Sequence, residues 1–207
     1  MKKITLLWIL SIILLGSANI FAQTFNYPGP AVNIPDYDIN GGWAEINVST
    51  VNPVSEVDYV TINLTHTWDS DLEIVLEFFD NSWILSNQNG GSGDNYTSTV
   101  FRDGGYPSIT SGTAPFTGTY APETPLPKFI DNFDPNGTWR LHVYDLVSGD
   151  VGTINSWSIT FKAPTCATIG FSGLPATMNC NDAAVQLEAS DFVTAGGRRL
   201  PDFVLRI

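Results

Sequence analysis

The stretch that most constrains this chain is residues 60–79, VTINLTHTWDSDLEIVLEFF, in which apolar side chains recur at every second position. This period is typical of β-strands that bury one face. We therefore predict two strands of one buried hairpin, joined by a turn at Asp69, Ser70 and Asp71. The residues expected to face the core are Val60, Ile62, Leu64, His66, Trp68, Leu72, Ile74, Leu76 and Phe78.

The predicted turn is acidic, which makes it the first candidate for function. Asp69 and Asp71 would repel each other unless solvent or a cation neutralised them. Asp is also common in turns that have no further role. The sequence leaves both interpretations open.

The rest of the chain also favours β-structure. Short alternating runs, separated by turns rich in Gly, Pro and Asn, predict further strands, the last two of which are expected to form a hairpin. They lie at residues 44–51, 83–85, 96–101, 114–120, 137–145 and 155–161. Residues 24–35 contain three prolines and fit an edge segment or an extended lead-in. With no helical spacing after the N-terminal region, we predict an all-β sandwich of about eight short strands.

Residues 1–22 have the features of a secretory signal peptide. A basic start at Lys2 and Lys3 precedes an apolar run that is too short to span a bilayer, and small residues follow this run. An uncleaved membrane anchor is the alternative. Cleavage is expected after Ala22, or else after Ala18, and would give a secreted or cell-surface protein that has no membrane segment.

The chain is strongly acidic, with a formal net charge of −12, and removal of Lys2 and Lys3 would take this charge to −14. Such a balance argues against nucleic-acid binding, which needs clustered Lys and Arg. The only basic cluster after the signal peptide is Arg198 and Arg199. Acidic secreted domains are often simply soluble, but they also suit hard divalent cations.

The composition changes near residues 162–165, KAPT, which we interpret as a linker. We divide the chain here into a β-sandwich domain, residues 23–162, and an incomplete module, residues 163–207. The second segment is too short to form a stable core of its own without a cross-link such as a disulfide. Cys166 and Cys180 lie in this second segment and would pair only in an oxidising compartment. Its final run, RRLPDFVLRI, suggests a gene fragment or a frame change.

Four segments carry a resemblance to a known family: THTWDSDLEIVLEF, NYTSTVFRDGG, APFTGTYAPETPLPKF and NGTWRLHVYDLVSGDVGTINSWSITF. In their order and approximate spacing they resemble the P domain, or Homo B domain, that follows the subtilisin-like catalytic domain of proprotein convertases and kexin-like proteins. This resemblance covers about residues 33–161. More weakly, FSGLPATMNCNDAAVQLEAS in the tail is similar to the start of immunoglobulin-like repeats in surface proteins of Bacteroidetes-type bacteria.

The resemblance implies a jelly-roll β-sandwich of the galactose-binding type, followed by a truncated Ig-like segment. It further implies a non-catalytic accessory domain that stabilises or targets an associated subtilisin-like serine endopeptidase or adhesin. The expected partner is therefore a catalytic or adhesive domain of a larger secreted protein. The alternative is a lectin-like module that binds cell-surface glycans, because fold alone does not fix function. Since the tryptophans mostly have core parity, packing is favoured over a sugar-binding platform.

The sequence offers little for catalysis by the chain itself. A hydroxyl nucleophile needs a base within hydrogen-bond reach, and the chain has two histidines, His66 and His142. His66 lies between Leu64 and Trp68 on the predicted buried face, so a core histidine is favoured over a catalytic one. No HExxH zinc motif, phosphate-binding loop or dinucleotide fingerprint occurs. We expect endopeptidase activity only in the associated protein.

Four aspartates are candidate calcium ligands: Asp71, Asp103, Asp145 and Asp150. All are predicted at strand ends or turns, and the turns of a sandwich converge on two rims. Calcium accepts several oxygen ligands at flexible angles, so acids distant in sequence can meet around one ion. The resemblance adds that some bacterial P domains bind calcium. Asp69 is a weaker candidate, and independent solvated turns are the alternative.

Overall fold

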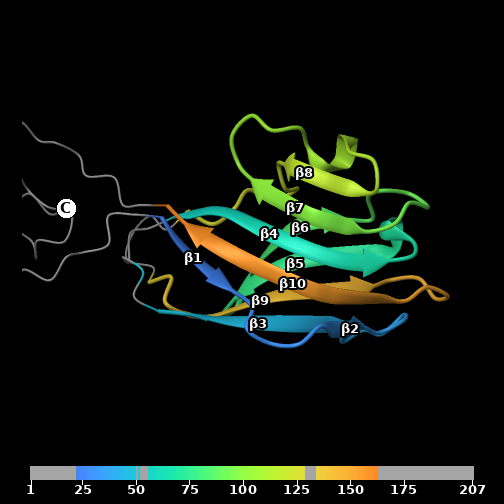
Figure 1. The fold of residues 1–207 in the computed structure, drawn as a ribbon, viewed down its shortest axis with the longest axis horizontal. Coiled ribbons are helices and arrows are strands. Elements are labelled where there is room, and N and C mark those ends of the chain that lie inside the picture. Colours follow the sequence, from blue (N-terminus) through green and yellow to red (C-terminus); the bar gives the residue numbers. More distant parts are fainter. Residues whose placement is uncertain (1–21, 50, 52–55, 129–133, 163–207) are drawn as a thin grey trace, which may run out of the picture. The chain divides into compact units, whose positions relative to one another are not determined.

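Two β-sheets pack face to face in the computed structural model, which describes residues 22–49, 51, 56–128 and 134–162. The first sheet has the strand order β1-β10-β4-β7-β8, with β2 also paired to β10 (Figure 1). All its pairs are antiparallel except β7 with β8. Its strands are β1 (Gln23–Asn26), β2 (Val32–Ile34), β4 (Val57–His66), β7 (Tyr96–Arg102), β8 (Phe116–Tyr120) and β10 (Gly152–Phe161).

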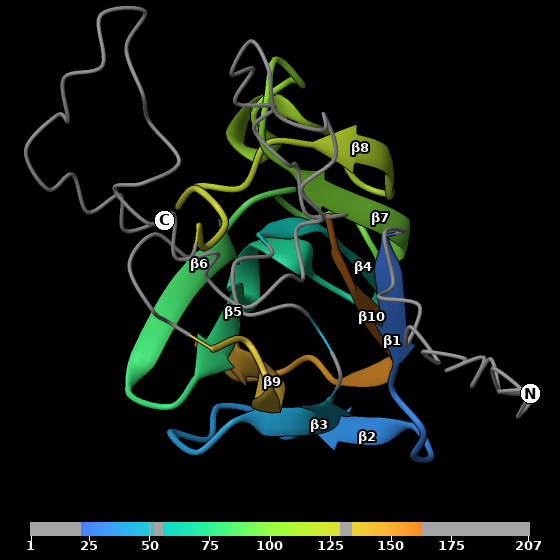
Figure 2. The same ribbon diagram turned by 90° about the vertical axis from the view of Figure 1, so that its left-hand side faces the viewer.

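The second sheet has the order β3-β9-β5-β6 and is antiparallel throughout. Figure 2 shows the two layers from one end, with β4 and β10 in one layer and β5 and β9 in the other. Its strands are β3 (Gly42–Val48), β5 (Leu72–Phe78), β6 (Asn81–Asn87) and β9 (Gly137–Asp145). Two single 3₁₀ turns, η1 (Asp69–Asp71) and η2 (Ile109–Ser111), complete the described elements. The predicted all-β jelly-roll sandwich is confirmed, with ten strands in the described residues instead of about eight.

The core lies between the layers because every central strand turns its alternate apolar side chains inward. The Trp139 ring stacks on Phe78 with ring centroids 4.4 Å apart and meets Phe161 of the other sheet edge-on at 5.7 Å. This arrangement confirms the predicted inward face of the last two strands. The buried residues of these strands include Trp139, Leu141, Val143, Trp157, Ile159 and Phe161.

The predicted hairpins at residues 60–79 and 137–161 are wrong. β4 pairs with β7 and β10, whereas β5 pairs with β6 and β9, so the connection 67–71 crosses from one sheet to the other. The connection 146–151 between β9 and β10 crosses in the same way. A connection of five or six residues spans the roughly 10 Å between packed sheets, and crossing lets both strands bury their apolar faces in one core. The hairpin of this region joins β5 to β6 through Phe79 and Asp80.

The two ends of the sandwich differ in what they carry. One end, which we call the crossing rim, comprises the connections 35–41, 67–71, 88–95 and 146–151, because β2, β4, β6 and β9 all end there. At the opposite end, the entry rim, Gln23 of β1 pairs with Phe161 of β10. The described chain therefore enters and leaves the sandwich at the same end.

Several predictions concern residues outside the described part of the chain. The signal peptide, residues 1–22, lies almost wholly outside it, as do the incomplete module, residues 163–207, and the cysteines Cys166 and Cys180. In the described part, no helix has both the length and the apolar character required to cross a membrane.

Candidate functional site

The two crossing connections lie side by side at the crossing rim. The N–H of Leu146 donates to the carbonyl oxygen of Asp71 at 2.8 Å, and the Thr67 hydroxyl donates to Asp150 Oδ1 at 2.6 Å. Each connection places an acid where its strand ends or begins. The rim therefore brings together carboxylates from segments about 80 residues apart in sequence.

A buried His–Asp pair closes the space between the sheets at this rim. His66 Nε2 lies 3.2 Å from Asp145 Oδ2, and neither side chain is exposed. The other ring nitrogen, Nδ1, lies 2.9 Å from the Trp68 carbonyl oxygen. His66 is thus the core histidine that the sequence favoured, held by a backbone carbonyl and an acid.

Asp69 is fully buried under the loop 88–95. Its Oδ1 accepts the N–H of Asn95 at 2.9 Å, whereas Oδ2 is buried without a hydrogen-bond partner. Burial raises the pKa of Asp69 to about 7, the Asn95 N–H lowers it in part, and the charge of Asp94 raises it further. A carboxyl group of this kind exchanges its proton near neutral pH.

Glycine allows the loop 88–95 to cover Asp69. Gly90 has a φ of +97°, and a Cβ at this position would lie 2.9 Å from the Cβ of Asp69 and 2.8 Å from the Phe116 ring. Beyond it, the carbonyls of Gly93 and Gly91 accept the N–H groups of Asp69 and Ser70 at 2.8 and 3.2 Å. Only a residue without a side chain combines this backbone conformation with such close packing. The composition of residues 87–95, NQNGGSGDN, is typical of a loop, but nothing in it indicates that the loop buries an acid.

Asp71 occupies the centre of the acidic group. Burial raises its pKa, the charges of Asp145 and Asp150 raise it further, and His66 offsets part of the effect. No described residue donates a hydrogen bond to its carboxylate. A positively charged ligand beside Asp71 would therefore lower the cost of keeping its carboxylate ionised.

The structure brings three of the four candidate calcium ligands to one rim. Asp103 follows β7 at the entry rim, where it accepts the N–H of Leu126 at 3.2 Å, and it does not approach Asp71, Asp145 or Asp150. Two of the remaining three already have partners: Asp145 lies beside His66 and accepts the N–H of Val147 at 3.2 Å, and Asp150 accepts the Thr67 hydroxyl. Within the described ranges, no three His, Cys, Asp or Glu side chains are grouped as a metal centre would require. The residues present fit a calcium ion only in part, through Asp71 and its two acidic neighbours.

Trp68 departs from its predicted place in the core. β4 ends at His66, so the alternation stops there, and Trp68 is 43% exposed. The alternation of Trp68 with Leu64 and His66 does not indicate this exposure, because the position at which a strand ends depends on its pairing with neighbouring strands.

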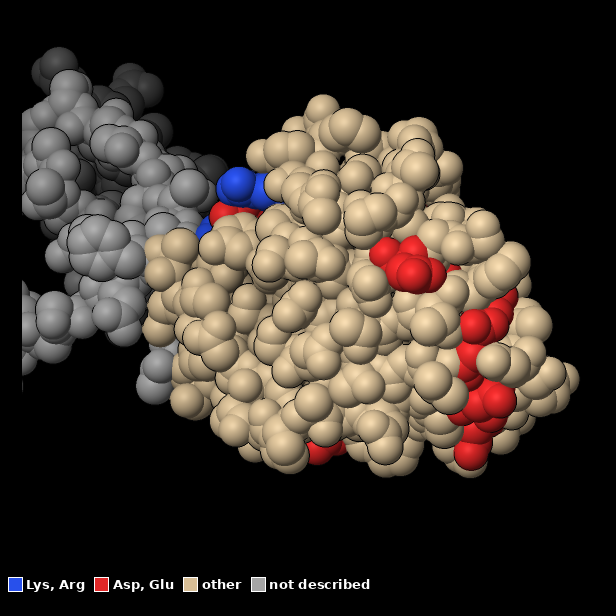
Figure 3. Space-filling model, turned by 45° about the vertical axis from the view of Figure 1, so that its right-hand side comes forward, with Lys and Arg blue, Asp and Glu red and all other residues tan. Residues whose placement is uncertain are grey.

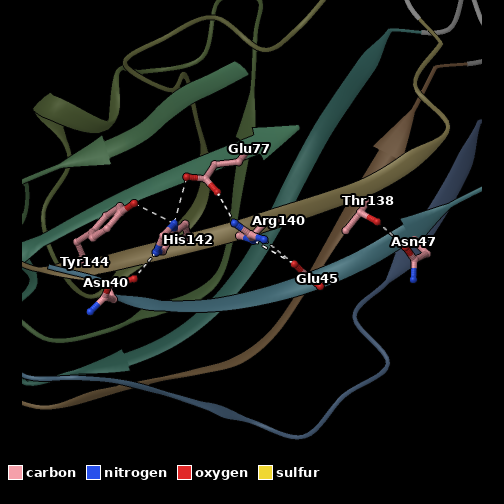
Figure 4. A network of polar contacts seen from close by, with 8 residues as sticks. All are labelled: Asn40, Glu45, Asn47, Glu77, Thr138, Arg140, His142 and Tyr144. Atoms are coloured by element: carbon pink, nitrogen blue, oxygen red, sulfur yellow. Dashed lines mark hydrogen bonds and ion pairs between the residues drawn. The ribbon is translucent and has the colours of Figure 1, made fainter. Parts of the chain in front are cut away.

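The second histidine belongs to a polar network on the outer face of the second sheet (Figure 4). His142 Nε2 lies 2.6 Å from the Asn40 carbonyl oxygen, and Nδ1 lies 3.1 Å from Glu77 Oε1 and 2.9 Å from the Tyr144 hydroxyl. Arg140 extends the network by donating to Glu45 at 2.7 Å. Beside it, Thr138 donates to Asn47 at 2.7 Å. The polar side chains of this network thus form hydrogen bonds with one another and with the backbone.

Neither imidazole in the described chain is available as a general base. A base must reach the proton of a nucleophile or of a water molecule through a free ring nitrogen. Both nitrogens of His66 and both of His142 already have partners. The geometry is that of structural histidines.

Comparison with known proteins shows what the chain is similar to. A family model described as the proprotein convertase P-domain matches residues 55–161. Leupeptin-inactivating enzyme 1 of Streptomyces exfoliatus is 32% identical over 132 residues, which cover 63% of this chain and 24% of that protein. The transglutaminase-activating metalloprotease of Streptomyces mobaraensis is 30% identical over 103 residues, which cover 49% of this chain and 10% of that protein. The chain thus spans a quarter or less of the length of these relatives.

Among solved structures, a serine protease of Aeromonas sobria matches 69% of this chain and 26% of its own chain, with a TM-score of 0.43 and 19% identity. The same organism's serine protease in complex with a chaperone matches 70% of this chain and 26% of its own, with a TM-score of 0.45 and 20% identity.

Proposed function

Because the chain belongs to the proprotein convertase P-domain family, we propose that it is a non-catalytic accessory domain of a secreted protein, where it stabilises or targets an associated endopeptidase or adhesin. The expected partner is a catalytic or adhesive domain of that larger protein. One relative is named as a metalloprotease, so the proposal does not restrict an associated peptidase to serine chemistry.

The observation that carries the proposal is the state of the two histidines. His66 is enclosed between the sheets with Asp145, and His142 is held in the outer network by Asn40 and Glu77. General-base activation of a hydroxyl or of water needs a base that these residues do not supply. The two histidines of the described domain therefore give no support to bond cleavage, which agrees with an accessory role in binding and folding.

A graft into a relative tests the accessory role. Leupeptin-inactivating enzyme 1 is produced intact, without the segment that matches this chain, and with that segment replaced by residues 23–162. We expect the deletion to lower the yield of active host enzyme and its Tm, and the graft to restore part of both. A graft carrying Trp139→Ala, which removes a core side chain, is the matched control. A folded graft that performs no better than the deletion would contradict the proposal.

Glycan binding is the second candidate, favoured by one observation on the outer face of the second sheet. Trp43 is 46% exposed, and the guanidinium of Arg140 lies 5.6 Å from its ring centroid. Aromatic rings beside polar side chains suit sugars, but here Arg140 already donates to Glu45 and Glu77, so a sugar would have to replace these bonds. A glycan array with the wild-type chain and Trp43→Ala separates this candidate from the first.

Calcium binding at the crossing rim remains a proposal that involves Asp71, Asp145 and Asp150, without Asp103. Calcium also accepts backbone carbonyls and waters, so it does not need every ligand to be a carboxylate. A bound ion would offset the mutual repulsion of these acids and stabilise the connections 67–71 and 146–151. Its effect on stability can be measured without any activity assay.

A further inference from the structure

Exposed apolar side chains gather at the crossing rim. Nine large hydrophobic side chains are exposed in the described residues, and six of them lie in the connections of this rim. Single exposed apolar residues are ordinary, whereas a group at one end of a domain marks an interaction surface. The six are Tyr37, Ile39, Trp68, Leu146, Val147 and Val151, with exposed fractions from 38 to 91%.

Hydrogen bonds hold the connections that carry these side chains against one another. Gly149 N–H donates to Asp36 Oδ1 at 3.0 Å, which fastens the connection 35–41 to 146–151. The bond from Leu146 to Asp71 fastens 146–151 to 67–71. The six apolar residues therefore belong to one continuous rim and not to separate loops.

The charge on this rim has a single sign. In Figure 3, acidic side chains form a band at one end of the face in view, and the basic side chains in view lie at the opposite end. Asp36, Asp38, Asp94 and Asp150 are at least partly exposed at the crossing rim. The four Lys and Arg residues of the described ranges lie elsewhere, near the entry rim or on the outer face of the second sheet; they are Arg102, Lys128, Arg140 and Lys162.

A groove of about 680 Å³ adjoins the rim, between β2, the end of β4 and the start of β10. Its lining includes the exposed acids Asp36 and Asp94 together with the exposed apolar residue Val151. A ligand in the groove would meet negative charge and apolar surface at the same time.

We propose that the crossing rim is a docking face for a basic polypeptide segment of a partner protein, in which Lys or Arg alternates with apolar residues. The apolar side chains of this segment would cover Trp68 and Val151, and its cations would lie near Asp36 and Asp94. Charge complementarity of this kind selects the partner and speeds its association. The position of the rim agrees with this role. The chain enters and leaves the sandwich at the opposite end, at Gln23 and Phe161, so these connections do not occupy the docking face. The inference rests on the proposed accessory role, which requires a face for the partner.

Three synthetic nine-residue peptides test the docking face by calorimetric titration of the full chain in a chelating buffer. One alternates Lys and Leu, the second Glu and Leu, and the third Lys and Gly. We expect saturable binding of the Lys/Leu peptide alone, with an affinity that falls as salt is added. The double variant Asp36→Asn/Asp94→Asn and the variant Trp68→Ser should each bind it about fivefold more weakly. Matched changes in the β5–β6 turn, Asp80→Asn and Phe79→Ser, should leave its affinity unchanged.

Each other outcome overturns the inference. Equal binding of the Lys/Leu and Glu/Leu peptides would show that charge does not select the ligand, and equal binding of Lys/Gly would show that the apolar rim takes no part. Loss of peptide binding in millimolar calcium, but not in sodium chloride of the same ionic strength, would mean that the acids serve a cation instead. If the graft stabilises its host while the Lys/Leu peptide fails to bind, the docking face is wrong and the accessory role stands.

Discussion

His66 Nε2 lies 3.2 Å from Asp145 Oδ2, although the two residues end strands of different sheets and are 79 positions apart in the chain. The pair joins the layers at the point where both crossing connections begin. Removing one partner would leave a buried polar or charged group unpaired, which costs far more than an exposed contact. We expect His66→Ala to lower the free energy of unfolding by about 3 kcal/mol in chemical denaturation. Thr65→Ala, on the exposed neighbour, should change it by less than about 1 kcal/mol.

The pH dependence of stability reports on Asp69. Its pKa is raised from 3.8 to about 7 in the folded state, so the folded chain holds a proton that the unfolded chain has lost between these values. This proton stabilises the fold fully below about pH 4, and its contribution is lost as the pH rises to about 7, by roughly 2 to 4 kcal/mol. Asp69→Asn imitates the protonated acid and should remove this loss. Denaturation curves in chelating buffer from pH 4 to 8 measure it, and parallel pH profiles for both proteins would show that Asp69 is ionised throughout.

The two core tryptophans differ in their hydrogen bonds. Trp139 Nε1 donates to the Pro135 carbonyl oxygen at 2.8 Å, whereas Trp157 Nε1 is buried without a partner. Either change to Ala should cost on the order of 3 to 5 kcal/mol because each leaves a large cavity. Changes to Phe should separate them, with Trp139→Phe costing about 1 kcal/mol more than Trp157→Phe, because only the former breaks a hydrogen bond and leaves its acceptor unpaired. Equal costs would contradict the described partners.

Calcium should raise the Tm of the chain if the crossing rim binds it, because only the folded state assembles the ligands. Thermal unfolding is compared in chelator and in millimolar calcium. Asp71→Asn should abolish the calcium-dependent rise, and Asp103→Asn should keep it, since Asp103 lies at the other rim. If calcium does not raise the Tm of the unmutated chain, the chain has no stabilising calcium site. If the two variants change the calcium-dependent rise in Tm equally, the crossing rim is not the site.

Apart from Trp68, the sequence predicted which side chains of residues 60–79 face the core, but not which strands lie beside each other. Alternation at Val60, Ile62 and Leu64, and again at Leu72 and Ile74, is a local property that survives in the fold, and all five residues are buried. Pairing depends on contacts distant in the chain. Two strands five residues apart therefore had the pattern of a hairpin although they belong to different sheets.

The candidate site could be predicted in the same partial way. Acids at turn positions indicate a rim, and Asp71, Asp145 and Asp150 lie at the same rim, although they are not grouped as a metal centre would require. Nothing local in the sequence shows that the loop 88–95 folds over Asp69. The turn at Asp103 resembles the others in sequence, and only the antiparallel pairing of β7 with β4 places it at the opposite end.

Hydrolysis assays with the purified chain test most directly whether the domain is non-catalytic. Casein and a dibasic peptide are incubated with the wild-type chain, His66→Ala and His142→Ala across neutral pH. We expect no hydrolysis above the buffer blank for any of the three, because both imidazoles are held by structural partners. Hydrolysis that persists through purification and disappears in His66→Ala, while that variant stays folded, would contradict it.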